Sequence, residues 1–306
     1  MRILAATGSG LVTLDPDTGQ QSRQLEGHRL SALAPAGRTR LWAAVDRREI
    51  WRNLGGGWEP VAQLPGGLEV TCLADTRANA EDGILAGTSK ARLGRVTPAG
   101  LIEFVEAFDH APGREDWFTP WGGPPGTRTL SEDRDTVYAN VHVGGVLRSR
   151  DEGATWEPTI DIEADVHQVA TGPGRVYAAG AQGLSISEDR GETWRTLHEG
   201  LHAAYCRAVA VCGEWLLLSA SDGPGAGRAA IYRSDPAGSR FERCRRGLPE
   251  WFQGNVDSLC LDALPKGDLA AFATESGEVY ASNDQGASWS PIGEGFDSIR
   301  RLLVLP

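Results

Sequence analysis

Four of the six histidines stand at the edges of short apolar runs in this 306-residue chain. Histidine is the commonest metal ligand and a general base near neutral pH, so each of these positions is a candidate for chemistry. No zinc-type spacing falls within one segment, and a metal site would therefore be assembled from separate segments. The expected ligands of a divalent metal ion are His28, His142, His167 and His202.

A tyrosine, an arginine and an aspartate accompany these histidines. Tyr205 and Arg207 open the apolar run that follows His202, and Asp165 stands two residues before His167. Tyrosine, arginine, carboxylate and imidazole groups that meet in one cavity are typical of a ligand or active site. The predicted catalytic residues are His142, Asp165, His167, Tyr205 and Arg207.

Pairs of carboxylates that cleave a glycosidic bond face each other at roughly 5–10 Å. Asp165 with Glu69 or Asp257 has the residue types for such a pair, and we expect Glu69 and Asp257 to contact the ligand. The alternative is that Asp161, Glu163 and Asp165, in TIDIEADVH, form a solvated acidic turn.

The segment 107–127, AFDHAPGREDWFTPWGGPPGT, carries four prolines and has no strand pattern. An insertion of this length in a compact domain is usually functional or disordered. Trp117 and Trp121 argue against disorder, because disordered segments are poor in aromatic residues. We expect the two tryptophans to form a ligand-binding platform or lid, or to pin the loop to the protein.

The elements that must position these residues are defined by a repeat. Residues 149–156, 187–194 and 282–289 share the template S-x-D-x-G-x-x-W, and residues 53–58 and 234–241 are weaker copies. The Ser and Asp side chains can accept backbone N–H bonds in a tight turn, and Gly supplies a positive φ. The aromatic residue is then expected to be buried against the hairpin.

The glycines of these turns recur in steps of 36, 45, 53, 38, 47 and 48 residues. A four-stranded propeller blade has about 40–50 residues, and each period here holds short apolar runs split by turn residues. The sequence therefore predicts an all-β, seven-bladed β-propeller with Asp-box repeats, as a single domain over residues 1–306. The seven glycines are Gly19, Gly55, Gly100, Gly153, Gly191, Gly238 and Gly286.

The two ends of the chain each supply part of one blade. Residues 299–305 resemble a first strand with no blade after them, and residues 2–7 resemble a second strand with none before them. Their pairing would remove an open sheet edge, so we expect the ring to close through the N- and C-terminal strands.

In propellers, the loops that enter the innermost strands and leave the second strands form one face around the central channel. By this rule we expect one group of side chains to lie at the mouth of the channel, with the 107–127 insertion over it. The group is His28, Glu69, His142, Asp165, His167, His202, Tyr205, Arg207 and Asp257. A concave convergence of polar groups under an aromatic loop describes a ligand site. The alternative is that the histidines line a water-filled channel, each bonded to a backbone carbonyl.

Composition restricts the partners. The net charge is −11, with 30 Lys and Arg against 41 Asp and Glu, so nucleic acid and anionic membranes are not expected to bind. The apolar run at the N-terminus is too short for a signal peptide, and no segment has the length of a membrane span. The five cysteines lack a C-x-x-C pair, and we expect reduced, structural thiols in a cytoplasmic protein.

The template turns resemble the Asp-box (BNR) repeats of bacterial sialidase-like, glycosyl hydrolase-like propellers, and VYANVHVGGVLRSRDEGATW and DVHQVA are similar to segments of that group. A sialidase needs an arginine triad, which Arg29, Arg207 and Arg300 would have to form, and a Tyr–Glu nucleophile. The Phe/Tyr-Arg-Ile-Pro opening of sialidase domains is absent, so the chain is not expected to be a typical sialidase.

Three functions are compatible with these observations. The first is binding or processing of a small molecule or carbohydrate at the channel mouth. The second is a metal-dependent lyase or oxygenase with histidines from several blades. The third is a non-enzymatic scaffold whose rim binds a protein partner. Substrate, reaction and metal identity stay open at this point.

Overall fold

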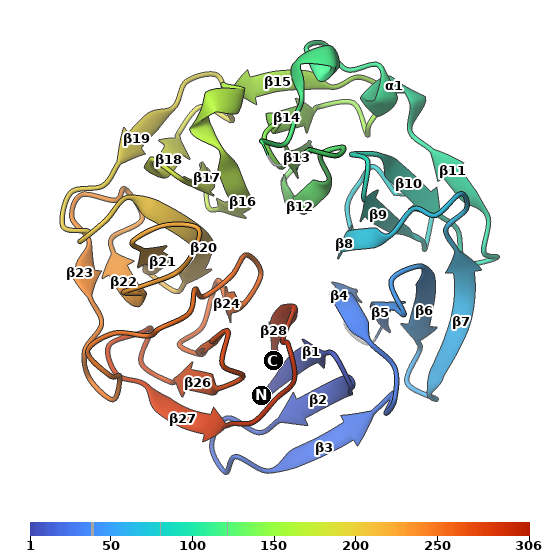
Figure 1. The fold of residues 1–306 in the computed structure, drawn as a ribbon. Helices are drawn as coiled ribbons and strands as arrows, with labels where there is room; N and C mark the ends of the chain where they lie inside the picture. The colour runs from blue at the N-terminus through green and yellow to red at the C-terminus, as the bar shows by residue number, and fades with distance from the viewer. Residues whose placement is uncertain (38–39, 80, 121) are drawn as a thin grey trace. The chain divides into compact units, whose positions relative to one another are not determined.

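The computed structural model describes residues 1–37, 40–79, 81–120 and 122–306. Within these residues the chain forms seven sheets, each of four antiparallel strands (Figure 1). The protein is therefore an all-β, seven-bladed propeller, as the glycine spacing predicts. By its internal contacts the chain divides into two compact units.

One unit comprises residues 28–176 and 187–193 and contains three complete sheets. Most of their inner strands are buried on both faces and consist of small and branched apolar residues, as in the β9 strand ILAGT. The strands are β4 (Leu30–Ala36), β5 (Arg40–Val45), β6 (Glu49–Asn53) and β7 (Trp58–Gln63); β8 (Val70–Ala74), β9 (Ile84–Thr88), β10 (Leu93–Val96) and β11 (Ile102–Phe104); and β12 (Thr127–Asp133), β13 (Thr136–Val141), β14 (Gly145–Ser149) and β15 (Glu157–Ile160).

The other unit comprises residues 1–27, 177–186 and 194–306 and also contains three complete sheets. Its core gathers apolar side chains from all three sheets, including Phe272 and Trp289. The strands are β28 (Arg301–Leu305), β1 (Arg2–Thr7), β2 (Gly10–Leu14) and β3 (Gln21–Gln24); β20 (Tyr205–Cys212), β21 (Trp215–Ser221), β22 (Ala230–Ser234) and β23 (Glu242–Arg243); and β24 (Leu261–Ala263), β25 (Ala270–Ala273), β26 (Val279–Ser282) and β27 (Ser290–Gly293).

The seventh sheet has the strand order β16-β17-β18-β19. Its first strand begins directly after a short 3-10 helix, η2 (Ile162–Ala164). The strands are β16 (Val166–Gly172), β17 (Arg175–Gly180), β18 (Gly183–Ser187) and β19 (Arg195–Leu197).

All seven glycines of the predicted repeat lie in the turn between the third and the outermost strand of a sheet. Each has a positive φ, between 67° and 99°, which only glycine adopts without strain. The period of the sequence therefore locates the same turn in every sheet. This confirms the assignment of one glycine turn to each blade.

The three full template copies share one set of hydrogen bonds, and we call residues 149–156, 187–194 and 282–289 the Ser-Asp turns. In the first, Ser149 Oγ accepts from the Gly153 N–H at 2.8 Å, and Asp151 Oδ1 accepts from the Thr155 N–H at 2.9 Å. The other two turns repeat both bonds. The expected side-chain capping of these turns is confirmed.

Burial of the template tryptophans is less uniform than the repeat predicts. Trp156 and Trp289 are 4% and 3% exposed, but Trp194 is only half-buried. The indole N–H groups of Trp156 and Trp194 both lack a hydrogen-bond partner within the described part of the chain, whereas that of Trp289 donates to the Gly286 carbonyl. The expectation that Trp194 is buried like the others is therefore wrong, and Trp289 is the better test of the template.

The Ser-Asp turns should make the folded state sensitive to acid. Hydrogen bonds from Thr193 lower the pKa of Asp189 to about 2, and those from Thr155 lower the pKa of Asp151. A carboxyl with a depressed folded pKa stabilises the fold above its unfolded value of about 3.9, and this stabilisation is lost as pH falls through the folded pKa. Melting temperatures of wild type and Asp189→Asn should differ by a constant amount above about pH 5 and converge towards about pH 2. A difference that stays the same across this range would contradict the assignment.

The first and last strands of the chain pair with each other. β1 and β28 are antiparallel neighbours, with Ile3 opposite Val304 and Ala5 opposite Leu302, and they complete one four-stranded sheet (Figure 1). The expected pairing of the two termini is therefore present. That this pairing closes the ring stays a prediction.

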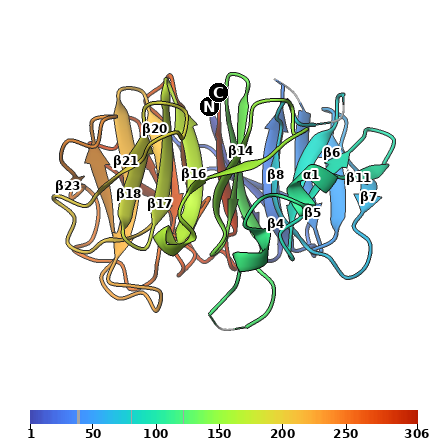
Figure 2. The same ribbon diagram turned by 90° about the horizontal axis from the view of Figure 1, so that it is seen from above.

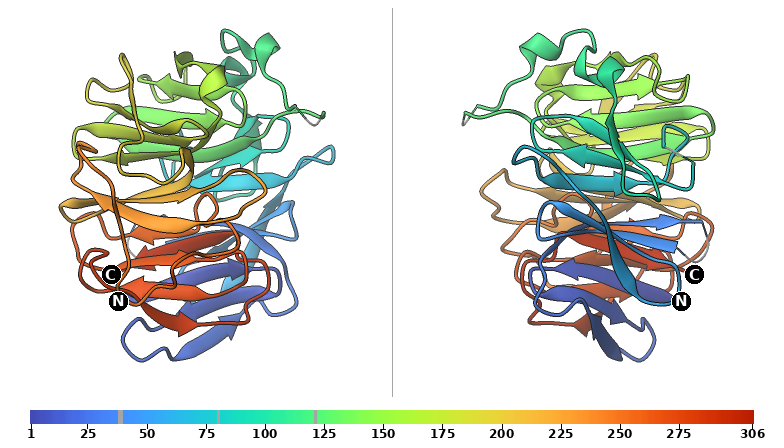
Figure 3. Two further views of the ribbon diagram at one scale, coloured as in Figure 1. Left: turned by 60° about the vertical axis from the view of Figure 1, so that its left-hand side comes forward. Right: turned by 90° about the vertical axis from the view of Figure 1, so that its right-hand side faces the viewer.

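The described residues of the insertion 107–127 include two short helical turns, in line with the argument from its tryptophans against disorder. The insertion begins within α1 (Glu106–Asp109), continues through a 3-10 helix, η1 (Arg114–Asp116), and projects beyond the strand ends before β12 (Figures 2 and 3). Phe108 is fully buried and anchors the segment in the core.

The five cysteines are free and buried, as expected for structural thiols. Burial raises the pKa of Cys212 and of Cys260 to about 12, so neither is a reactive thiolate. Among the described residues, no helix has the length and apolar character needed to cross a membrane.

Candidate functional site

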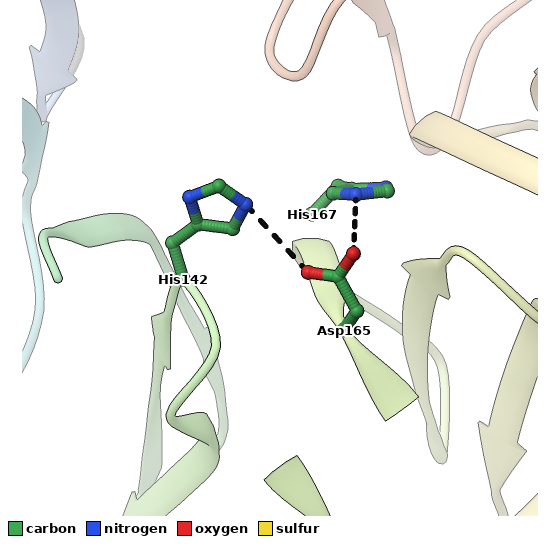
Figure 4. A group of neighbouring side chains, drawn as sticks. All are labelled: His142, Asp165 and His167. Carbon is green, nitrogen blue, oxygen red and sulfur yellow. Dashed lines mark ion pairs between the residues drawn. The ribbon is translucent and has the colours of Figure 1, made fainter. Parts of the chain in front are cut away.

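Three of the predicted site residues meet at the ends of neighbouring strands. His142 directly follows β13, Asp165 directly precedes β16, and His167 is the second residue of β16. His142 Nε2 lies 3.6 Å from Asp165 Oδ1, and His167 Nε2 lies 3.5 Å from Asp165 Oδ2 (Figure 4). One ligand atom from each residue falls within 4.8 Å of the other two. We call His142, Asp165 and His167 the HDH site.

A buried hydrogen bond ties the two strands that carry the HDH site. Asn140 is fully buried in β13, and its Nδ2 donates to the carbonyl of Val166 in β16 at 3.0 Å. Asn140 is two residues from His142, and Val166 is adjacent to His167. This buried bond therefore holds together the two strands whose backbones carry His142 and His167.

Asp165 is held in an unusual backbone conformation. Its φ of 42° and ψ of 64° are left-handed, a region that Asp tolerates better than most residues but at some cost. Such strain is often found where a side chain must point in a required direction. Here the conformation places the carboxylate between the two imidazoles (Figure 4).

The surroundings keep the Asp165 carboxyl ionised. The imidazole of His167, 3.5 Å from Oδ2, lowers the pKa of Asp165, burial opposes this, and the charges of His142 and Arg128 lower it further. The net direction is downward. Asp161 and Glu163, the other acids of the segment, are exposed, so the alternative of a solvated acidic turn applies to them and not to Asp165.

The HDH site has the donor types of a transition-metal site, in a slightly wider arrangement. Zn–N and Zn–O bonds are about 2.0–2.2 Å, which places two ligand atoms of a tetrahedral ion about 3.3 Å apart. The two nitrogen–oxygen distances are 3.6 and 3.5 Å but involve different oxygens of Asp165, and the three ligand atoms lie within 4.8 Å of one another, so the side chains would move closer together around an ion. Asp165 Oδ1 is buried without a hydrogen-bond partner within the described residues, and an ion would satisfy it. Two imidazoles and one carboxylate leave coordination positions open, as in catalytic sites.

The structure gives His28 a different partner. His28 precedes β4, as predicted, but its Nδ1 lies 2.7 Å from Asp46 Oδ2, and its ring packs 5.3 Å from the ring of Trp51. Asp46 also accepts the Arg29 N–H, so it holds the start of the strand. The third ligand atom near His142 and His167 comes from Asp165, two residues before His167 in the chain, and not from His28.

His202 also has both ring nitrogens engaged by protein groups. Its Nδ1 lies 2.7 Å from Tyr232 Oη, and its Nε2 lies 2.9 Å from the carbonyl oxygen of Arg228. The ring stacks on Tyr232 and contacts Trp251. This arrangement matches the alternative of a histidine bonded to a backbone carbonyl.

Tyr205, Arg207 and Asp257 form a second group. Arg207 Nη1 donates to Asp257 Oδ1 at 2.5 Å, and Nη2 donates to Tyr205 Oη at 3.3 Å. Burial lowers the pKa of Arg207, but Asp257 and Tyr205 more than offset it and the net direction is upward. Arg207, Asp257 and Arg300 line a cavity of about 260 Å³. Asp257 lies before β24, in a turn of residues 257–260 in which Leu259 has a φ of 64°.

The remaining ligand-binding predictions have mixed outcomes. Glu69 precedes β8 as predicted, but it accepts from Arg47 at 2.7 Å and is not part of the HDH site. Trp117 packs against Phe108, and a Cβ added at Gly144 would lie 3.1 Å from its ring. Trp117 therefore rests on the turn that carries His142, which favours the pinning role. Trp121 lies outside the described residues.

Comparisons with known proteins support the fold and leave the chemistry open. No protein-family model and no curated protein sequence matches the chain. Three solved β-propeller structures are similar to the chain at 12–14% identity. YCF48 bound to D1 peptide has a TM-score of 0.60, and the match covers 93% of this chain and 87% of that chain. A mitotic checkpoint complex has a TM-score of 0.60 with 98% of this chain and 85% of that chain covered, and an ancestral GH74 enzyme has a TM-score of 0.63 with 97% of this chain and 40% of that chain covered. Likeness at this identity establishes the propeller fold alone.

Proposed function

We propose that the protein is a metal-dependent propeller that holds one divalent transition-metal ion at the HDH site and acts there on a small molecule. The observation that carries the proposal is the convergence of His142, Asp165 and His167 from two adjacent sheets within 4.8 Å. Neighbouring sheets have no folding requirement for two imidazoles and an ionised carboxylate at one point. Packing at such positions is more simply achieved with apolar residues.

The donor set defines the class of metal and chemistry. Imidazole and carboxylate ligands suit zinc, iron and manganese, and a site with three protein ligands keeps a position for water or substrate. A metal there supplies Lewis acidity or an activated water. The protein's own contribution is to fix the ligands through the Asn140–Val166 bond and to keep Asp165 ionised. A glycosidase with Asp165 and Glu69 as its pair is not favoured, since Glu69 is bonded to Arg47.

Metal binding by single variants tests the proposal. Protein purified without a histidine tag and stripped by chelation should bind about one Zn²⁺ per chain in a calorimetric titration. His142→Ala and Asp165→Asn should each weaken binding by at least about 100-fold, since loss of a partner behind a ligand alone costs 10- to 100-fold.

The matched control is His28→Ala, which removes an imidazole of the same unit that is bonded to Asp46. It should leave zinc affinity unchanged. His142 is 21% exposed in its side chain, so His142→Ala should cost less than about 1 kcal/mol of stability. His167 is 1% exposed, and its removal should cost about 1–3 kcal/mol, which makes His142 the cleaner variant. Reduced melting with unchanged metal occupancy in both variants would exclude the site.

A second candidate is recognition of a peptide or protein. It is supported by the propeller neighbours that are described as peptide-bound or as part of a checkpoint complex. We also propose that the chain is a divergent relative of the Asp-box group, because its three Ser-Asp turns share one hydrogen-bond pattern. A chain that binds no divalent metal but retains a protein partner through its rim would favour this second candidate.

A further inference from the structure

An open pocket of about 560 Å³ lies beside the outermost strand β23 and is separate from the HDH site in sequence and in lining. Three arginines line it, Arg240, Arg243 and Arg245, and they come from a seven-residue stretch that also contains Arg246. The volume is in the range of pockets that hold small molecules, about 300–1,000 Å³.

The charges of this pocket are not neutralised by the protein. Arg240, Arg243 and Arg245 make no ion pair within the described residues, whereas arginines elsewhere, such as Arg52, Arg92 and Arg148, bond carboxylates. In a chain with 41 acids and 30 bases, three unpaired guanidinium groups around one space are unexpected. Glu242 is the pocket's one lining carboxylate, so positive charge dominates there.

Aromatic residues hold part of this surface in place. The guanidinium of Arg243 lies 4.0 Å from the ring centroid of Trp251, and His202 packs against the same ring at 4.6 Å. Tyr232 is buried, and the charges of Arg243 and Arg245 partly offset the effect of that burial on its pKa. Arg243 is therefore positioned against Trp251 before any ligand arrives.

Protein groups engage both ring nitrogens of His202. A backbone carbonyl only accepts, so His202 Nε2 donates to Arg228 O, and Nδ1 lies 2.7 Å from Tyr232 Oη. Tyr232 Oη in turn accepts the His202 N–H. The network is satisfied internally, and the ligand-facing charge comes from the arginines.

We propose that this pocket binds a small molecule that carries two or more phosphate-type oxyanion groups. Guanidinium groups match phosphate oxygens in geometry, with two parallel N–H···O bonds to each. A cluster of three can neutralise a diphosphate or a bisphosphate, which a single surface arginine cannot. The inference does not depend on the proposed metal site.

The test is calorimetric binding of pyrophosphate, a nucleoside diphosphate and a hexose bisphosphate to metal-free protein. Each experiment is repeated with His142→Ala, so that phosphate held by residual metal at the HDH site is recognised. Wild type and His142→Ala should bind at least one probe equally. The three probes separate recognition of the phosphates alone from recognition of a nucleoside or sugar carrier.

The variant Arg240→Glu/Arg245→Glu should weaken that binding by at least about tenfold, because a charge-assisted bond is lost at each position. Both side chains are exposed, so the fold should be retained. Arg23→Glu, an exposed arginine of β3 in the same unit, is the control and should bind as wild type. Wild-type affinity in the double variant, or no binding of any probe to wild type, would overturn the proposal.

Discussion

Deletion of Leu302–Pro306 is expected to abolish stable folding of the unit that contains β1. The deletion removes all but one residue of β28, which pairs with β1 along its whole length. Leu302, Leu303 and Val304 are 0%, 4% and 4% exposed. Burial of each such side chain contributes about 1.5–3 kcal/mol, so their combined loss is comparable with the whole stability of a domain, about 5–15 kcal/mol.

The same deletion tests the prediction that the paired termini close one domain. If they do, thermal unfolding of wild type should be a single transition, and the truncated chain should lose it entirely. Removal of Pro306 alone, which is exposed and follows β28, should leave melting unchanged. A truncated chain that melts like wild type would contradict the role of β28.

Trp289→Ala should cost roughly 3–5 kcal/mol of unfolding free energy, as large aromatic truncations in cores do. Trp289 is 3% exposed, its indole N–H donates to the Gly286 carbonyl at 3.2 Å, and its ring meets Phe272 edge-on at 4.9 Å. The substitution therefore removes packing, a buried hydrogen bond and an aromatic contact together.

Chemical denaturation of Trp289→Ala and Trp194→Ala provides the comparison. Trp194 holds the same template position but is half-buried, so its loss should cost clearly less. Neither change should alter zinc affinity at the HDH site. Equal costs for the two variants would mean that burial of the template ring does not determine its contribution.

The parts of the fold that sequence predicts well are those set by local chemistry. A turn that needs a glycine with a positive φ and Ser and Asp side chains to cap it can be recognised from a few neighbouring residues. The spacing of these turns along the sequence then predicts where each four-stranded sheet lies in the chain. The α1–η1 segment was not predictable in this way. Burial of Phe108 in the core orders this segment. Such a long-range contact leaves no pattern among the neighbouring prolines and glycines of the sequence.

The candidate site was only partly predictable. The sequence places His142, Asp165 and His167 at strand ends of adjacent repeats, but it does not reveal that Asp165 takes the position expected for His28. That outcome depends on the left-handed conformation of Asp165 and on Asp46, which engages His28 from another turn. The arginine pocket was missed, although Arg240, Arg243, Arg245 and Arg246 form a visible basic run in an acidic chain.

The most direct test of the proposed function is the anomalous X-ray signal from crystals grown with zinc. The account predicts one strong peak about 2.0–2.2 Å from His142 Nε2, His167 Nε2 and an Asp165 carboxylate oxygen. The peak should be absent from crystals of His142→Ala grown in the same way. No peak at the HDH site in the wild-type crystals, with these three side chains unchanged in position, would contradict the claim that they hold a metal.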